Sequence, residues 1–191
     1  MVTPPMSAED HLRALLAQLG FDADPECQAT PEAFVAFLRG MDPGRPGPEL
    51  TLLDSSSTDP VVLRDMGFYS LCAHHLVPFL GQACVAIRPA GRLVGLGSIA
   101  RLLHHHAHRP QIQERLGATL ADELMERLGA RTVCVHLRAR HLCMEMRGSR
   151  TPAWVETLAW RGEDDPQLRA LLADLVPGGP TTSGGCHGGR G

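Results

Sequence analysis

Residues 61–88 read VVLRDMGFYSLCAHHLVPFLGQACVAIR, and both ends of this stretch have the character of β-strands. Residues 61–70 and 82–88 are rich in Val, Ile, Phe and Tyr, which fit a pleated, half-buried surface. We therefore expect two antiparallel strands, with Cys72 and His75 in the connection between them. A loop held by a sheet is a common place for ligands and catalytic groups.

The connection and a later segment hold residues of the kind that bind metals. Cys72 and His75 stand close together, and His141-Leu142-Cys143 follows far along the chain. Two thiolates and one imidazole suit zinc, and three protein ligands leave a fourth position for water, as in catalytic sites. We predict zinc bound by Cys72, His75 and Cys143. The alternative is that these are ordinary buried cysteines and loop histidines, which is the commoner role of each residue alone.

The same reasoning extends to His141. We expect residues 141–147 to form a strand, in which His141 and Cys143 point to the same face because side chains alternate. The imidazole of His141 would then lie beside Cys143, the third predicted ligand. These groups together predict a hydrolase.

The remaining pattern alternates helices and strands. The order of two strands, two helices and two strands predicts an α+β fold with an N-terminal helical extension. Ser7 is expected to cap a helix ending near Gly20, Thr30 to cap one ending at Gly40, and Ser98 to cap one ending near His108. Further elements are expected at 110–128 (a helix opened by Pro110), 132–139 and 153–160 (strands), and 165–175 (a helix).

Composition divides the chain into three parts. Residues 1–60 are an N-terminal helical extension followed by an arm rich in Pro, Gly and Ser. Residues 61–176 are the catalytic domain, and residues 177–191 are a Gly-rich tail too poor in apolar residues to fold.

Charge and cysteine usage restrict the partners and the compartment. The net charge is −3, without a long run of like charges, so we expect neither nucleic acid nor membrane surface as a partner. No apolar run approaches the ~20 residues that span a bilayer, and no signal peptide is visible. The six cysteines lack the spacing of a disulfide framework, which favours the reducing cytoplasm and no disulfides.

A cluster of histidines, His104, His105, His106 and His108, lies in the helix predicted after Ser98. His104 and His108 share a helical face at a spacing that can bind metal, but no acidic or sulfur partner accompanies them. We interpret the cluster as partly exposed or interfacial histidines with a pH-sensitive charge.

Several motifs in one order make residues 61–148 similar to a known family. They are Cys72-Ala73-His74-His75, Gly95-Leu96, Arg101, Arg109-Pro110-Gln111-Ile112-Gln113-Glu114-Arg115-Leu116, His141-Leu142-Cys143-Met144 and Arg147-Gly148. With them the chain resembles GTP cyclohydrolase I. The resemblance implies a tunnelling fold, in which helices back an antiparallel sheet, and a homodecamer with active sites between subunits. It also implies Zn²⁺ on Cys72, His75 and Cys143, and hydrolysis of GTP at C8 to formate and 7,8-dihydroneopterin triphosphate.

The resemblance also assigns roles to the remaining site residues. His74 and His141 are placed to transfer protons as catalytic residues. Glu114 would accept hydrogen bonds from guanine, with Gln113 adding another. Of the cations expected at the triphosphate, Arg101 and Arg147 remain.

Three expected cations are missing from the chain. Ser98 stands where the family motif G-L-S-K has its lysine, and Ala33 and Ala36 replace the two cations of T-P-x-R-x-x-K. Ala73 also replaces the acidic residue of C-E-H-H, removing a partner that could orient a group near the metal. All 18 basic residues are Arg, so avoidance of Lys does not explain the losses, because Arg was available.

These departures leave three functions open. The first is hydrolysis of GTP itself. The second is the same ring opening on a guanine compound with fewer phosphates, or on a related heterocycle. The third is a zinc-stabilised binding subunit without turnover, against which the retention of His74 and His141 speaks.

Overall fold

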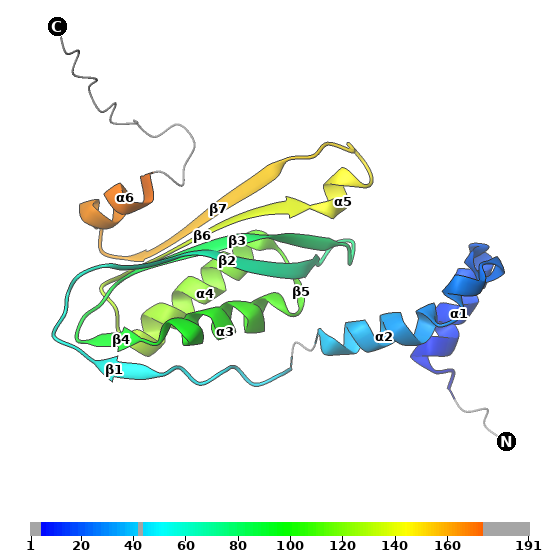
Figure 1. Ribbon diagram of the computed structural model, residues 1–191, viewed down its shortest axis with the longest axis horizontal. Coiled ribbons are helices and arrows are strands. Elements are labelled where there is room, and N and C mark those ends of the chain that lie inside the picture. The colour runs from blue at the N-terminus through cyan, green and yellow to red at the C-terminus, as the bar shows by residue number, and fades with distance from the viewer. Residues whose placement is uncertain (1–4, 42–43, 174–191) are drawn as a thin grey trace, which may run out of the picture.

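The computed structural model describes residues 5–41 and 44–173 of the chain. Its N-terminal extension comprises α1 (Ala8–Gln18), the short 3₁₀ helices η1 (Phe21–Ala23) and η2 (Pro25–Cys27), and α2 (Thr30–Gly40). These helices project away from the sheet and its covering helices (Figure 1). Among the described residues, no helix combines the length and the apolar character needed to cross a bilayer.

The two predicted N-terminal caps have different outcomes. Ser7 caps α1 as expected: its hydroxyl accepts a hydrogen bond from the Asp10 amide at 3.0 Å, and the Asp10 carboxylate accepts one from the Ser7 amide. The capping role of Thr30 was wrong. Thr30 is the first helical residue, Ala29 precedes the helix, and no side chain caps it.

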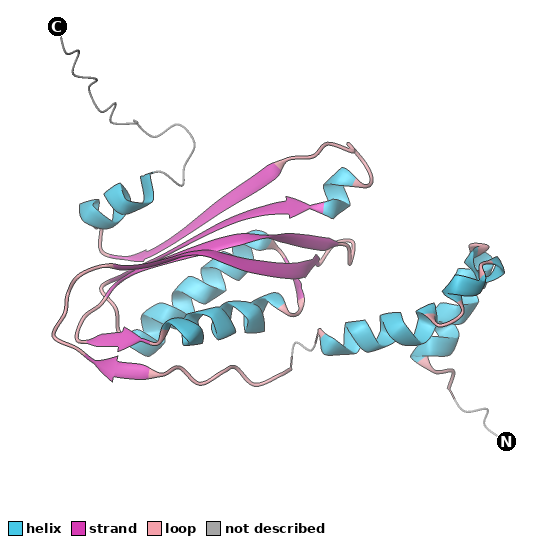
Figure 2. Ribbon diagram, in the orientation of Figure 1, coloured by secondary structure: helices cyan, strands magenta, loops and turns pink. Residues whose placement is uncertain are grey.

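A sheet forms the body (Figure 2). It has five strands in the order β5-β2-β3-β6-β7. All neighbouring strands are antiparallel except β5, which runs parallel to β2. The short strands β1 and β4 pair separately. The bounds are β1 (Leu52–Asp54), β2 (Val61–Cys72), β3 (Pro78–Arg88), β4 (Arg92–Val94), β5 (Pro110–Gln111), β6 (Thr132–His141) and β7 (Trp154–Gly162).

Alternation along β3 separates the two faces of the sheet. Ala83, Val85 and Ile87 point into the main core beneath α3 (Leu96–Ala107) and α4 (Gln113–Leu128). Cys84 and Ala86 point to the other face, where α6 (Pro166–Leu172) covers them. Burial of each large apolar side chain contributes about 1.5–3 kcal/mol. The fold is therefore α+β, an antiparallel sheet backed by two helices, as predicted.

Two predicted elements are wrong near the ends of strands. Residues 142–145 form the helix α5 (Leu142–Glu145) in place of a strand. The ladder explains this, because His141 pairs with Phe79 at the start of β3 and Arg140 is the last residue paired with β7. Beyond them the described residues offer no partner strand. A helical turn satisfies the backbone instead, with the Met146 amide donating to Leu142 O at 2.8 Å.

The second error concerns Pro110, which was expected to open a helix. Pro110 instead lies in β5 at the edge of the sheet, and α4 begins at Gln113. Proline is tolerated in an edge strand because one side of the strand needs no hydrogen-bond donor.

The arm between α2 and β1 is fixed along the covering helices. Arg127 Nη1 donates to Pro48 O at 3.0 Å, and the Gly95 amide donates to Thr51 O at 2.9 Å. The Ser98 hydroxyl accepts from the Thr51 amide at 3.0 Å. Ser98 was predicted to cap α3, but the N-cap is Gly95. Ser98 instead anchors the arm.

Candidate metal centre

A tight turn brings the first two candidate ligands together. The Leu76 amide donates to Cys72 O at 2.8 Å, and the Cys72 amide donates to Val77 O at 2.9 Å. Leu76 completes the turn with a φ of 53°, in the left-handed region. As a result, the chain doubles back and His75 Nδ1 lies 3.6 Å from Cys72 Sγ.

The third candidate ligand arrives from α5. One ligand atom from each of Cys72, His75 and Cys143 lies within 4.8 Å of the other two. Cys72 is buried, Cys143 half-buried and His75 exposed, so the group opens to solvent on one side. The predicted convergence is present. The strand that was expected to turn His141 and Cys143 to one face is not, because Cys143 lies on the helical turn α5.

The chemistry of this group fits a zinc ion. Burial and the neighbouring Cys72 thiol raise the pKa of the Cys143 thiol. Two thiols this close disfavour a pair of thiolates unless a cation lies between them. Two sulfurs and one imidazole are the soft donor set that zinc prefers.

His141 is held in one orientation beside this group. Its ring stacks on Phe79 with the centroids 4.8 Å apart and the planes at 5°. His141 Nε2 donates to Gln113 Oε1 at 2.8 Å. Burial lowers the pKa of His141, so its neutral form is favoured near pH 7.

Gln113 determines which nitrogen of His141 carries the proton. Its Nε2 lies within 3.0 Å of both Leu137 O and Val155 O and 3.2 Å from Thr157 Oγ1, all of them acceptors. The amide oxygen must therefore face His141, which places the ring proton on Nε2 and leaves Nδ1 as an acceptor. The Gln113 side chain is only 1% exposed, so the structure assigns it an internal contact that the sequence did not reveal.

The other predicted residues divide between two places. His74 is exposed, with Nδ1 3.8 Å from Cys72 Sγ. Glu114 is exposed at the start of α4, near enough for its charge to oppose the lowering of the His141 pKa. Arg147 is exposed and follows α5. Its positive charge lowers the pKa of the Cys143 thiol and so opposes the effect of burial.

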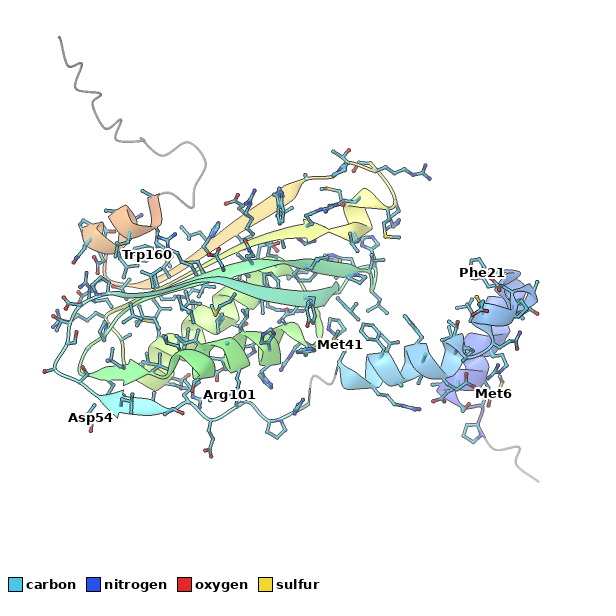
Figure 3. The ribbon with its side chains drawn as sticks, viewed as in Figure 1. Met6, Phe21, Met41, Asp54, Arg101 and Trp160 are labelled. Carbon is cyan, nitrogen blue, oxygen red and sulfur yellow. The ribbon has the colours of Figure 1, made fainter. Side chains whose placement is uncertain are left out.

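Arg101 lies apart from this group. It belongs to α3, on the side that faces the arm (Figure 3). Its Nη2 donates to Ser98 Oγ at 2.9 Å. Within one chain, therefore, Arg147 and Arg101 belong to different sites.

The family model and the curated relatives agree on one family. The family model described as GTP cyclohydrolase I matches residues 8–176. The "GTP cyclohydrolase 1" of Rhodopirellula baltica is 40% identical over 176 residues, which cover 88% of this chain and 77% of that protein. That of Mycobacterium tuberculosis is 43% identical over 179 residues, covering 88% and 89%. Among solved structures, an archaeosine synthase QueF-Like in the apo form matches with a TM-score of 0.48 and 16% identity, over 58% of this chain and all of that chain.

Proposed function

The chain belongs to the GTP cyclohydrolase I family, and we propose that it hydrolyses the imidazole ring of GTP at C8, releasing formate and forming 7,8-dihydroneopterin triphosphate. It is a hydrolase of the GTP cyclohydrolase I type. The observation that carries the proposal is the convergence of Cys72, His75 and Cys143 within 4.8 Å beside an oriented His141.

Zinc held by Cys72, His75 and Cys143 would supply a Lewis acid and lower the pKa of a water molecule to about 7. The chain's own residues supply proton transfer. Both C8–N bonds must break, and each nitrogen that leaves C8 must gain a proton. His141 can accept a proton at Nδ1 because Gln113 holds Nε2–H. Exposed His74, which lies between Cys72 and His75 in the sequence, can donate one.

Glu114 is the proposed reader of the base. Its exposed carboxylate lies near enough to His141 to affect the His141 pKa, and it can accept from guanine N1–H and the 2-amino group. Adenine presents no donor at N1, so a carboxylate here favours guanine. Gln113 contributes indirectly, because its amide is already bonded to Leu137 O and to His141. It orients His141 and leaves base recognition to Glu114.

The test is direct. Purified zinc-loaded protein is incubated with GTP, GMP or guanosine, and formate and a fluorescent oxidised pterin are measured. We expect turnover of GTP in the unsubstituted protein and in Cys27→Ala, whose thiol lies in η2 outside the metal group, and none in Cys143→Ala. Turnover of GMP but not GTP would defeat GTP as the substrate.

A second candidate function is the same ring opening on a guanine compound with fewer phosphates. The specific observation in its favour is Ser98, which is 1% exposed and bonded to the arm, so that it offers no charge to a phosphate. Ala33 and Ala36 likewise offer none. The comparison of GTP with GMP decides between the two candidates.

We further propose a homo-oligomer, a homodecamer by resemblance, in which Arg101 of one copy serves the site of another. Within one chain Arg101 lies outside the metal group, which supports a shared site. Mixing Arg101→Gln with Cys143→Ala subunits after partial dissociation should then restore part of the activity that each lacks alone. No recovery in mixed oligomers would place all functional groups within one chain.

A further inference from the structure

The short strand β5 joins the metal-ligand turn to the start of α4 (Figure 1). It pairs in parallel with the end of β2, with Cys72 opposite Gln111. The Ala73 amide donates to Gln111 O at 2.9 Å, so the turn after Cys72 is bonded to the main chain of residue 111. A single residue, Ile112, separates Gln111 from α4. β5 is therefore a direct main-chain link between the metal group and that helix.

The side chain of Gln111 is buried and bonded at both ends of its amide. Gln111 is only 3% exposed. Its Nε2 donates to His106 O at 3.2 Å, near the end of α3, and its Oε1 accepts from Arg115 Nε at 2.6 Å, in the first turn of α4. Gln111 thus bonds the end of one covering helix and the start of the next to β5.

The residues on either side of Glu114 are both anchored. Gln113 is bonded to the main chain of β6 and β7, and Arg115 is bonded to Gln111 Oε1. Glu114 itself is exposed. The direction of a helical side chain follows from the backbone that carries it. The two anchors therefore fix the direction in which Glu114 leaves α4.

The bond between Gln111 and Arg115 is the stronger of the two contacts that Arg115 makes with β5. It joins a neutral oxygen to a charged donor at 2.6 Å, whereas Arg115 Nη2 donates to Pro110 O at 3.1 Å. Arg115 is exposed, so its guanidinium can turn to water when the Gln111 oxygen is removed. The anchor beside Glu114 would then be reduced to the longer contact with Pro110.

We propose that Gln111 is a positioning residue for recognition of guanine, acting through Arg115 on Glu114. This inference rests on the proposed function, in which the Glu114 carboxylate accepts hydrogen bonds from the base. Gln111 holds that carboxylate at a fixed place relative to the metal group, to which β5 is bonded through the Ala73 amide. A carboxylate displaced by about 1 Å loses part of the hydrogen bonding that distinguishes guanine from hypoxanthine, which lacks the 2-amino group.

The test compares the binding of two ligands to the zinc-loaded full chain by calorimetry. They are the 8-oxo derivatives of GTP and ITP, which differ only in the 2-amino group. Each already carries oxygen at C8 and cannot yield formate. The unsubstituted protein should bind the guanine derivative about tenfold or more tightly, the effect of one charge-assisted contact. In Gln111→Leu, which removes both amide contacts, this ratio should fall to about threefold or less.

Two further variants make the result specific to the bond with Arg115. Gln111→Glu keeps an oxygen for Arg115 Nε and should keep the ratio. Thr132→Val removes a buried hydrogen bond to Glu163 O, at the opposite end of β6 from His141, and should keep it as well. A ratio of two dissociation constants does not depend on the fraction of folded protein, so a loss of stability alone leaves it unchanged.

Formate release from GTP, measured in parallel, separates this role from the proposed hydrolysis. Loss of the ratio in Gln111→Leu alone upholds the role even if the unsubstituted protein releases no formate. Gln111 has no such role if Gln111→Leu keeps the ratio of Thr132→Val, or if the unsubstituted protein does not prefer the guanine derivative. Loss of the ratio in Gln111→Glu as well would overturn the action through Arg115.

Discussion

Cys143 is the proposed ligand that comes from α5, and its thiol neighbours that of Cys72. Cys143→Ala removes one of three donors, and we expect zinc to be lost and activity with it. Zinc per chain, measured by mass spectrometry after dialysis, checks this. Cys27→Ala is the matched control and should keep a full complement; retention of zinc by Cys143→Ala would show that the ligand set is different.

His141 separates proton transfer from metal binding. His141→Ala should keep its zinc, because the imidazole bonds to Gln113 and stacks on Phe79. Turnover should fall by about 10² or more if the ring transfers protons. Equal loss of zinc in His141→Ala and Cys143→Ala would mean that His141 is itself a ligand.

Gln113 positions His141 without contacting the metal group in any described hydrogen bond. Gln113→Leu removes the acceptor for His141 Nε2–H and leaves Leu137 O and Val155 O without their donor. We expect a kcat lowered about tenfold or more with KM for GTP little changed, because the ring loses its fixed tautomer. A rise in KM alone would indicate instead that Gln113 contacts the base.

Single residues differ in how far the sequence reveals them. Cys72, His75 and Cys143 were predicted as ligands because donor chemistry is a property of the side chain itself. The role of Gln113 was not, because its acceptors on β6 and β7 come together only in the folded sheet. The stacking of Phe79 on His141 likewise follows from the register of β3 with β6.

At the scale of elements, one ion pair joins α6 to β3. Asp165 caps α6 by accepting from the Leu168 amide at 2.9 Å and binds Arg88 through both oxygens, at 2.6 and 3.1 Å. Asp165→Ala removes the helix cap and the bidentate ion pair with Arg88. The Arg88 guanidinium then keeps only its hydrogen bonds to Thr58 O and Gln167 Oε1. We expect the free energy of unfolding to fall by about 2 kcal/mol or more, measured by urea denaturation.

The same pair predicts a dependence on pH. The hydrogen bond from Arg88 lowers the pKa of Asp165 below its ordinary value of 3.8. A carboxylate with a lowered pKa in the folded state stabilises above its unfolded pKa, and this contribution is lost as pH falls through the folded pKa. The difference in stability between the unsubstituted protein and Asp165→Asn should therefore be constant near pH 7 and shrink below about pH 4.

Elements were predicted well where local pattern and burial agree. The amphipathic helices and the long strands around residues 61–88 fall where expected. The two errors depend on strand pairing, which a local sequence pattern does not determine. Pro110 pairs with the edge of the sheet as β5, and residues 142–145 lie beyond the paired part of β6.

For the whole molecule, the N-terminal extension leaves apolar surface uncovered. Phe34 and Phe37 of α2 are 39% and 43% exposed, and α1 has no buried residue among those described. Such a surface favours association. Phe34→Ser with Phe37→Ser should lower the molar mass measured by light scattering, while circular dichroism shows unchanged helix content. An unchanged mass would place the subunit contacts elsewhere.

The division into extension, catalytic domain and tail could be proposed from composition alone. The boundary at residue 60 stays a prediction: β1 (Leu52–Asp54) lies within the predicted extension yet pairs with β4, and the tail at 177–191 lies outside the described residues. What composition could not supply is the course of the arm, because its anchors, Arg127 and Ser98, are distant in sequence.

The surroundings of Ser98 restrict which side chains position 98 can hold. Its hydroxyl is enclosed and serves two donors, the Thr51 amide and Arg101 Nη2. Ser98→Lys alone would leave the Thr51 amide without its acceptor and place a long cation in a space that holds a hydroxyl. A lysine at this position would therefore require compensating changes in the arm.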